Sequence, residues 1–265
     1  MRRQGTMRQN GRGSAYTENG QAVPRDSSRA VELKRALDVT VAAAALLVLS
    51  PLIVLVALAV KLESHGPAFF RCLRVGRGGS TLSMLKFRKM RDGVGGPALT
   101  AVRDDRFTRI GGFLAKTKLD ELPQLWNVLR GQMSLVGPRP EDPSIVELQP
   151  GEYAHILRVR PGITGLSQLA FANEAEILAE HDRLGDYVNR ILPEKMRLDR
   201  LYVERHSLRM DLQIIAWTVA AVVLRKRPAV HRATGRLTMR TPRDLEMAPV
   251  SFNSASVSVK TTQSA

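Results

Sequence analysis

The chain has 265 residues, and its 40 lysines and arginines against 25 aspartates and glutamates give it a formal charge of +15. This charge predicts an anionic partner, for which nucleic acid, an anionic membrane surface and a phosphorylated substrate all qualify. The single cysteine, Cys72, excludes an internal disulfide framework and a zinc site built from cysteines. An aromatic content of 5% argues against a binder of single-stranded nucleic acid built on stacking platforms.

Both ends of the chain are polar and lack hydrophobic periodicity. Residues 1–28 are rich in glycine and arginine, and residues 228–265 become rich in serine and threonine. Segments of this composition do not bury enough apolar surface to fold on their own. We therefore predict a disordered basic arm over 1–28 and a disordered tail over 228–265.

A long apolar run from Val39 to Val60 predicts a membrane helix within residues 29–64. Its length is close to the roughly 20 apolar residues that a membrane-crossing helix needs. However, Ser50-Pro51 falls near its midpoint, where proline kinks a helix, and basic residues lie beyond both ends. A re-entrant helix that breaks there keeps both basic flanks on one side, with the Ser50 hydroxyl satisfying a freed backbone group. The residues leave the spanning and the re-entrant helix as open alternatives.

A β-hairpin is predicted next. Ala68–Phe70 and Thr81–Phe87 resemble short strands around the glycine loop 76–79, which has neither the spacing of a dinucleotide fingerprint nor a Walker lysine. Alternation along the second strand places Lys86 and Arg88 on the same side. Two such cations either bind phosphate or form a solvated face.

Two adjacent carboxylates, Asp120 and Glu121, come just before an apolar periodic run that ends at Gly131. The pattern predicts one amphipathic helix entered through the acidic pair. Because the start of a helix favours anions, the carboxylates are either a helix cap or the neighbours of a bound phosphate.

Cations surround this acidic pair on both sides in the sequence, at Lys116, Lys118, Arg130 and Arg139. Arg139 lies in the stiff turn 137–140, Gly-Pro-Arg-Pro, which presents its guanidinium in a fixed direction. Carboxylates among cations indicate phosphate chemistry with a metal, and hard oxygen ligands of this kind suit Mg²⁺.

The last apolar segment, Leu208–Leu224, is interrupted by polar and charged residues. This pattern predicts an amphipathic helix lying against the membrane or the core rather than a second span. The basic residues that follow it, Arg225, Lys226 and Arg227, suit anionic lipid.

Several motifs between about Arg29 and Arg225 resemble, in order and spacing, those of the bacterial sugar transferases. They are KRALD (34–38), Ser50-Pro51, GPAFF (66–70) with RVG (74–76), KFRKM (86–90), DDRFTRIG (104–111), KLDELPQLWNVLRGQMSLVGPRP (118–140) and RPGITG (160–165). The pair LDELPQL and VGPRP is highly specific. The chain is therefore similar to a monotopic phosphoglycosyl transferase, or undecaprenyl-phosphate sugar phosphotransferase, which begins exopolysaccharide or O-antigen (lipopolysaccharide) assembly.

This resemblance implies an α+β, mostly helical fold with a small β-hairpin, amphipathic interfacial helices and a re-entrant membrane helix broken at Ser50-Pro51. The catalytic domain is expected over residues 65–227. It is expected on the cytoplasmic face of the bacterial inner membrane.

The resemblance also implies a reaction: a sugar 1-phosphate passes from a nucleotide diphosphate sugar, expected to be a UDP-sugar, to polyprenyl (undecaprenyl) phosphate with the help of Mg²⁺. Asp120 is expected to be the nucleophile, forming an aspartyl-phosphosugar intermediate, and Asp120 and Glu121 are the expected metal ligands. The candidate residues for binding substrate phosphate are Lys86, Arg88, Lys118 and Arg139.

The chain departs from the family pattern near these residues. Ala115 stands where arginine is usual, and Lys118 stands where serine is common, so Lys118 is a candidate to replace the missing charge. Lys89 stands where the family usually has threonine or serine, and Cys72 stands where it often has glutamine. These positions concern the details of substrate binding rather than the class of reaction.

A second hypothesis is a membrane-anchored basic module that binds an anionic partner such as nucleic acid. It accounts for the charge and the apolar run, but it gives no reason for two carboxylates between cations. We therefore predict an enzyme that uses a nucleotide sugar and polyprenyl phosphate in contact with membrane lipid, and we expect no nucleic acid. The sequence indicates neither the sugar nor the oligomeric state.

Overall fold

The computed structural model describes residues 28–94, 104–172, 183–226, 228–231 and 233–239. In this part of the chain most residues are helical, and the strands form three two-stranded sheets. The predicted mostly helical α+β fold with a small hairpin is confirmed. Nearly all of the predicted basic arm and the end of the predicted tail lie outside the described residues.

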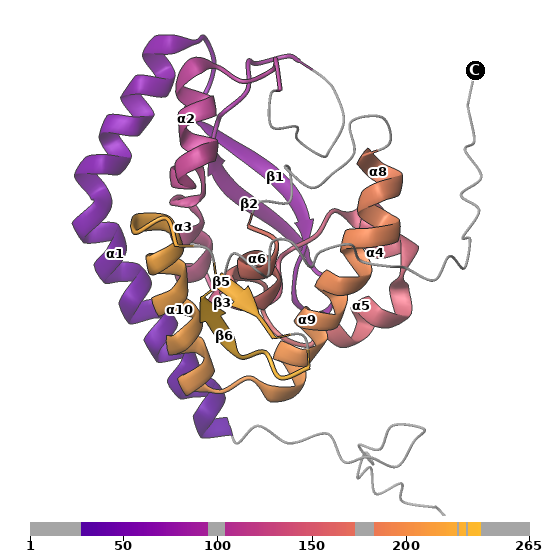
Figure 1. The fold of residues 1–265 in the computed structure, drawn as a ribbon. Helices are drawn as coiled ribbons and strands as arrows, with labels where there is room; N and C mark the ends of the chain where they lie inside the picture. Colours follow the sequence, from indigo (N-terminus) through magenta and orange to yellow (C-terminus); the bar gives the residue numbers. More distant parts are fainter. Residues whose placement is uncertain (1–27, 95–103, 173–182, 227, 232, 240–265) are drawn as a thin grey trace, which may run out of the picture.

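The longest element is α1 (Ser28–Glu63), a bent helix that runs along one edge of the molecule (Figure 1). Among the described residues it is the one helix long and apolar enough to cross a membrane, by length and composition alone. Pro51 lies inside it and has no N–H to donate to the carbonyl of Leu47. The hydroxyl of Ser50 donates to that carbonyl at 2.8 Å, as expected for a freed backbone group. The expected break at Ser50-Pro51 is not present, because α1 continues through Pro51 as one helix.

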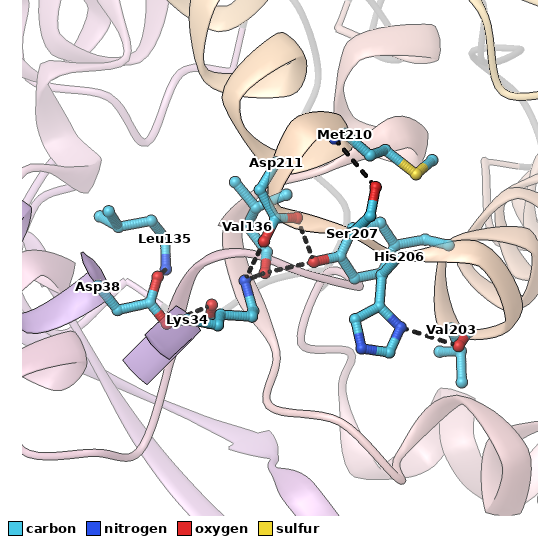
Figure 2. A network of polar contacts seen from close by, with 11 residues as sticks. Lys34, Asp38, Leu135, Val136, Val203, His206, Ser207, Met210 and Asp211 are labelled. Atoms are coloured by element: carbon cyan, nitrogen blue, oxygen red, sulfur yellow. Dashed lines mark hydrogen bonds and ion pairs between the residues drawn. The ribbon is translucent and has the colours of Figure 1, made fainter. Parts of the chain in front are cut away.

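The N-terminal part of α1 docks on the body of the protein through charged side chains (Figure 2). Lys34 Nζ forms an ion pair of 2.6 Å with Asp211 Oδ2. The buried carboxylate of Asp38 accepts hydrogen bonds from Ser134 Oγ at 2.8 Å and from the N–H of Leu135 at 3.1 Å. These contacts hold the start of the helix against the body.

The C-terminal end of α1 returns to the same body. The carboxylate of Glu63 accepts the N–H of Ile110, and buried Val60 packs in a cluster with Phe87 and Leu114. A helix of 36 residues is about 54 Å long if straight, so contacts at both ends require the body to extend along it. Because α1 bends around the body, both of its ends can contact that body at the same time (Figure 1).

Arg88 holds this end of α1, a role not predicted from the sequence. The residue is 5% exposed, and its guanidinium donates to the carbonyls of Val60, Ser64 and His65 and to the Ser64 hydroxyl. The expected shared strand face of Lys86 and Arg88 does not apply, because the strand ends at Phe87. A guanidinium at the last carbonyls of a helix also interacts favourably with the helix dipole.

The predicted hairpin is confirmed. Strands β1 (Phe69–Val75) and β2 (Thr81–Phe87) pair antiparallel, with Phe69 opposite Phe87 and Val75 opposite Thr81. The first strand extends beyond the predicted Ala68–Phe70. The predicted glycine turn is a short 3-10 segment, η1 (Arg77–Gly79).

The remaining elements up to residue 205 are mostly short. In chain order they are α2 (Arg109–Thr117), η2 (Leu119–Glu121), α3 (Gln124–Leu129), β3 (Ser134–Val136), α4 (Pro143–Leu148), α5 (Pro150–Ile156), β4 (Gly162–Thr164), α6 (Leu166–Ala170), α8 (Arg183–Asp186), η3 (Tyr187–Ile191) and α9 (Leu192–Arg205). The main hydrophobic cluster lies among β2, α3, β3, α6, α9 and the following helix, α10 (Leu208–Val223).

Strands β3 and β4 form a parallel pair that fixes the turn carrying Arg139. A Cβ on Gly162 would lie 2.1 Å from the nitrogen of Gly137, so only glycine allows the two backbones to approach this closely. Val136 is paired with Thr164 at the end of β3. The Gly-Pro-Arg-Pro turn therefore starts from an anchored backbone.

The C-terminal part contains one confirmed and one wrong prediction. The amphipathic helix is present as α10, with Asp211 and Ile214 buried and Val223 exposed. The tail predicted to be disordered from residue 228 instead begins with a hairpin, β5 (Pro228–Val230) and β6 (Leu237–Met239), that packs on the main cluster. The prediction failed because the segment is mostly polar, so its composition does not indicate the few apolar contacts that it makes.

Candidate active site

The acidic pair lies in a 3-10 turn rather than in the predicted α-helix. Lys118 ends α2 with a left-handed backbone (φ 60°), η2 then carries Asp120 and Glu121, and α3 begins only at Gln124. The predicted helix end at Gly131 is confirmed, because Gly131 follows α3 with φ 77°. The turn is held between two helices, which fixes the direction of both carboxylates.

Glu121 contacts two of the predicted cations. Its Oε1 lies 2.9 Å from Lys86 Nζ and 3.2 Å from an Arg139 Nη. Burial raises the pKa of Glu121, but the charges of Lys86, Arg139 and Lys118 together outweigh burial and hold the pKa well below its usual range. Glu121 is therefore an anion at neutral pH.

Asp120 contacts a lysine that the sequence indicated only as a departure from the family pattern. Asp120 is 2% exposed, and its Oδ2 lies 3.4 Å from Lys89 Nζ. Burial lowers the pKa of Lys89, while the charges of Asp120 and Glu121 oppose this shift. A further indication in the sequence is spacing, since Lys89 follows Lys86 by three residues. The two lysines contact the two adjacent carboxylates.

The other predicted phosphate-binding residues are placed differently. Lys118 is exposed and lies near enough to Glu121 to lower its pKa. Arg88 is bonded to the end of α1, and among the described residues neither Asp120 nor Glu121 is one of its hydrogen-bond partners. The structure thus brings Lys86, Lys118 and Arg139 to the acidic pair, but not Arg88.

A buried polar network supports the turn of Arg139. Glu141 Oε1 accepts a hydrogen bond from Tyr187 Oη at 2.9 Å and lies 3.3 Å from Lys195 Nζ. Burial raises the pKa of Glu141, but Lys195 and Arg139 outweigh it and lower the pKa. Arg139 therefore contacts one anion, Glu121, and lies near enough to a second, Glu141, to lower its pKa.

Asp199 is a second buried acid of this region that the sequence did not single out. Its Oδ1 accepts a hydrogen bond of 2.6 Å from Ser167 Oγ. Burial raises its pKa to about 7, although Ser167 and Lys195 oppose the shift. Asp199 therefore titrates near neutral pH.

The acidic pair has oxygen atoms available for a metal. Within the described residues, Asp120 Oδ1 and Glu121 Oε2 accept no hydrogen bond, and no group of three or more histidine, cysteine or acidic side chains could hold an ion by itself. Mg²⁺ characteristically binds one or two carboxylates and completes its shell with water and substrate phosphates. The donor set therefore fits Mg²⁺ shared with a phosphorylated substrate.

A separate open groove of about 630 Å³ lies beside the N-terminal part of α1, and neither residue of the acidic pair lines it. Its lining includes Arg35, Arg77 and Arg160 beside the apolar residues Val31 and Val39. Burial lowers the pKa of Arg160, and the charges of Arg77 and Arg35 lower it further. The groove is a second cationic surface of the protein.

Comparison with known proteins gives a consistent result. The family model described as bacterial sugar transferase matches residues 29–225. A UDP-glucose:undecaprenyl-phosphate glucose-1-phosphate transferase of Caulobacter vibrioides is 41% identical over 200 residues, covering 73% of this chain and 71% of that protein.

Two further relatives differ greatly in length. The exopolysaccharide production protein PSS of Rhizobium leguminosarum bv. phaseoli is 40% identical over 203 residues, which cover 73% of this chain and 96% of that protein. An undecaprenyl-phosphate glucose phosphotransferase of Komagataeibacter xylinus is 38% identical over 195 residues, covering 70% of this chain. The matched region spans 35% of that longer protein.

Proposed function

The chain belongs to the bacterial sugar transferase family and is an enzyme, and from this premise we propose that it transfers glucose 1-phosphate from UDP-glucose to undecaprenyl phosphate. The observation that carries the proposal is a buried aspartate, Asp120, beside an anionic glutamate, with Lys86, Lys89 and Arg139 in contact with the two carboxylates. The choice of glucose follows the names of the relatives from Caulobacter vibrioides and Komagataeibacter xylinus. The product begins exopolysaccharide or O-antigen assembly.

In the proposed mechanism Asp120 is the nucleophile. A carboxylate oxygen forms a bond to the phosphorus attached to glucose, and the bond from this phosphorus to the oxygen of UMP breaks, so that UMP leaves with the electron pair. The phosphosugar is then held as an acyl phosphate, as in the aspartyl phosphates of ATPases. A phosphate oxygen of undecaprenyl phosphate displaces Asp120 in the second step, and the carboxylate is regenerated.

The surrounding cations match the charge of this reaction. Arg139 contacts Glu121 and lies near Glu141, and its planar guanidinium suits two oxygens of one phosphate. Lys86 and Lys118 add positive charge beside Glu121. Mg²⁺ bound by Asp120 and Glu121 would supply further positive charge at the phosphates.

The proposed placement of α1 is re-entrant, with the enzyme on the cytoplasmic face of the bacterial inner membrane. It is supported by the contacts of Lys34 and Asp38 near one end and of Glu63 at the other with the same body. A helix that crossed the bilayer would separate these ends by the hydrocarbon thickness of about 30 Å, with the body on one side only. The proline in α1 and the Ser50 bond to Leu47 also fit a bent helix.

The placement is tested by single cysteines at Arg29 and Arg77 in a Cys72→Ser background. In intact cells, an impermeant thiol reagent should label neither position, and permeabilised cells should show labelling of both. Labelling of either cysteine from outside the intact cell would overturn the re-entrant placement.

The reaction is tested with radiolabelled UDP-glucose, Mg²⁺ and undecaprenyl phosphate. We expect an organic-soluble product, with UDP-galactose and UDP-N-acetylglucosamine as comparison donors. Without undecaprenyl phosphate, we expect release of UMP approaching one equivalent per active enzyme, because a covalent intermediate divides the reaction in two. Absence of product with every donor would refute the proposed reaction.

Two variants separate the roles of the carboxylates. Asp120→Asn should abolish both turnover and the release of UMP, since an amide is a poor nucleophile. Glu121→Gln should slow the reaction and raise the Mg²⁺ concentration needed for half-maximal rate. If Glu121→Gln alone lost the covalent adduct, the two roles would be exchanged.

A further inference from the structure

Two lysines at the end of β2 meet the two carboxylates of the candidate site one to one. Lys86 Nζ lies 2.9 Å from Glu121 Oε1, and Lys89 Nζ lies 3.4 Å from Asp120 Oδ2. The side chain of Asp120 is 3% exposed and that of Lys89 is 27% exposed, so the second pair lies at the edge of the site. Lys89 therefore contacts Asp120 and is also open to a ligand.

The backbone of Lys89 is fixed more firmly than its place after a strand would suggest. Its carbonyl accepts the N–H of Thr108 at 3.1 Å, and the next residue, Met90, forms a β-bridge with Phe107. Gly111 of α2 lies directly against it, because a Cβ on Gly111 would come 1.8 Å from the Lys89 carbonyl oxygen. The ammonium therefore extends from an anchored main chain, and it lies 5.7 Å from the centre of the Phe107 ring.

The contact between Lys89 and Asp120 is one-sided. It involves Oδ2, while Oδ1 accepts no hydrogen bond from any residue in the described part of the chain. At 3.4 Å the pair is longer than the roughly 2.7–2.9 Å of a strong charge-assisted hydrogen bond. Lys89 thus restrains one oxygen of the carboxylate and leaves the other available to react.

We propose that Lys89 is a positioning residue for the transfer: it holds Oδ2 of Asp120 so that Oδ1 faces the phosphorus, and its charge then balances the phosphoryl oxygens. This inference rests on the proposed function, in which Asp120 is the nucleophile. When Oδ1 uses a lone pair to form the O–P bond, the bond to UMP breaks and UMP takes the electron pair.

The charge change explains why this arrangement favours reaction. The carboxylate is negative before the attack and becomes an uncharged acyl group in the intermediate, so Lys89 loses its ionic partner as the bond forms. The negative oxygens of the transferred phosphoryl group are then close to Oδ2 of Asp120, which Lys89 contacts. The ammonium of Lys89 interacts with these phosphoryl oxygens instead of the carboxylate. Only interactions that strengthen in the transition state accelerate a reaction, and this one strengthens as the phosphoryl group arrives.

The test uses Lys89→Met, Lys89→Arg and, as a matched control, Lys61→Met, which removes an exposed lysine of α1. The measurements are the rate of UMP release in a single turnover without acceptor, the KM for UDP-glucose and the melting temperature. Lys89→Met should slow UMP release roughly 100-fold, with a much smaller change in KM and no effect in the control. Lys89→Arg should recover part of the rate, because it keeps the charge.

A second measurement separates the amine from folding. The chain has a single cysteine, so Lys89→Cys in a Cys72→Ser background can be alkylated with 2-bromoethylamine, which rebuilds a lysine-like side chain on the folded protein. The rate of UMP release should rise at least tenfold on alkylation, while the melting temperature stays within the range of the unmodified sample.

The outcomes distinguish the two proposals. Unchanged UMP release in Lys89→Met, or no recovery after alkylation, would overturn the role of Lys89 alone. Absence of UMP release in the wild type, while turnover with undecaprenyl phosphate is normal, would instead overturn Asp120 as nucleophile.

Discussion

Removing the charge of Lys34 should destabilise the docking of α1 by a predictable amount. Its ammonium lies 2.6 Å from Asp211 Oδ2 and donates to the carbonyl of Val136 at 3.2 Å. Tyr202 Oη donates to the other oxygen of Asp211 at 2.7 Å and also lies 3.1 Å from the Val136 carbonyl. The network joins α1, β3, α9 and α10, and the side chain of Asp211 is only 2% exposed.

The expected magnitude follows from this burial. Lys34→Met leaves Asp211 a buried carboxylate with one hydroxyl donor, and breaking a buried ion pair in this way costs about 3–5 kcal/mol. The side chain of Lys34 is 21% exposed, so water compensates in part and we expect the lower end, about 3 kcal/mol. For a folded region of this size, that corresponds to a fall in Tm of about 6–12 °C.

A double variant distinguishes the ion pair from simple loss of packing. Lys34→Met with Asp211→Leu removes both charges, so its free energy of unfolding should lie closer to the wild type than that of Lys34→Met, with a coupling energy of about 2 kcal/mol. Thermal unfolding of all variants in the same detergent provides the measurement. Lys61→Met, an exposed lysine near the other end of α1, is the control.

Two results would refute this reasoning. One is a Tm for Lys34→Met no lower than that of the Lys61→Met control. The other is a double variant as unstable as the sum of the two single changes, which would show that Lys34 and Asp211 do not depend on each other.

Three further predictions concern the site and the membrane helix. Arg139→Lys keeps the charge but loses the planar fork, so kcat/KM for UDP-glucose should fall roughly 10- to 100-fold; an unchanged value would reduce Arg139 to a structural residue. The raised pKa of Asp199, about 7 against 3.8, means that the folded state keeps a proton that the unfolded chain loses. Stability should therefore fall as the pH rises from about 4 to about 7, and Asp199→Asn should flatten this dependence of Tm; an equally steep profile would contradict the assignment. Ser50→Ala leaves the Leu47 carbonyl without its hydroxyl donor and should cost about 1 kcal/mol in thermal unfolding, whereas an unchanged Tm would mean that the bond contributes nothing.

Local patterns were enough to predict the elements whose structure depends on neighbouring residues. The bounds of β2 follow from its alternation and from the glycine turn before it, and Gly131 ends α3 because a left-handed residue is needed there. The same local reasoning failed one residue beyond the strand. Alternation holds only while a strand continues, and β2 ends at Phe87, so Arg88 is free to turn toward α1.

The parts of the site that could not be predicted depend on contacts between distant segments. Glu141, Lys195 and Asp199 belong to a loop and to α9, and nothing in the spacing of either segment indicates that they share one buried network. The contact of Lys89 with Asp120 has the same character, because it requires β2 to end beside η2. The partner of a buried charged residue depends on which polar groups the packing brings together away from water, and the sequence around the residue does not specify this.

The placement of Arg88 connects the proposed membrane helix directly to the chemistry. Its guanidinium donates to the carbonyl of Val60 in the last turn of α1 and to that of Ser64 just after it. On either side of Arg88 in the chain lie the two lysines that contact Glu121 and Asp120. Any shift of the end of α1 relative to the body must therefore strain the short segment that carries both lysines. The acceptor of the proposed reaction is a phosphate on a lipid, which stays at the depth of the membrane surface. A re-entrant α1 anchored through Arg88 would set the acidic pair at a constant height above that surface, so that the lipid phosphate and Asp120 can meet.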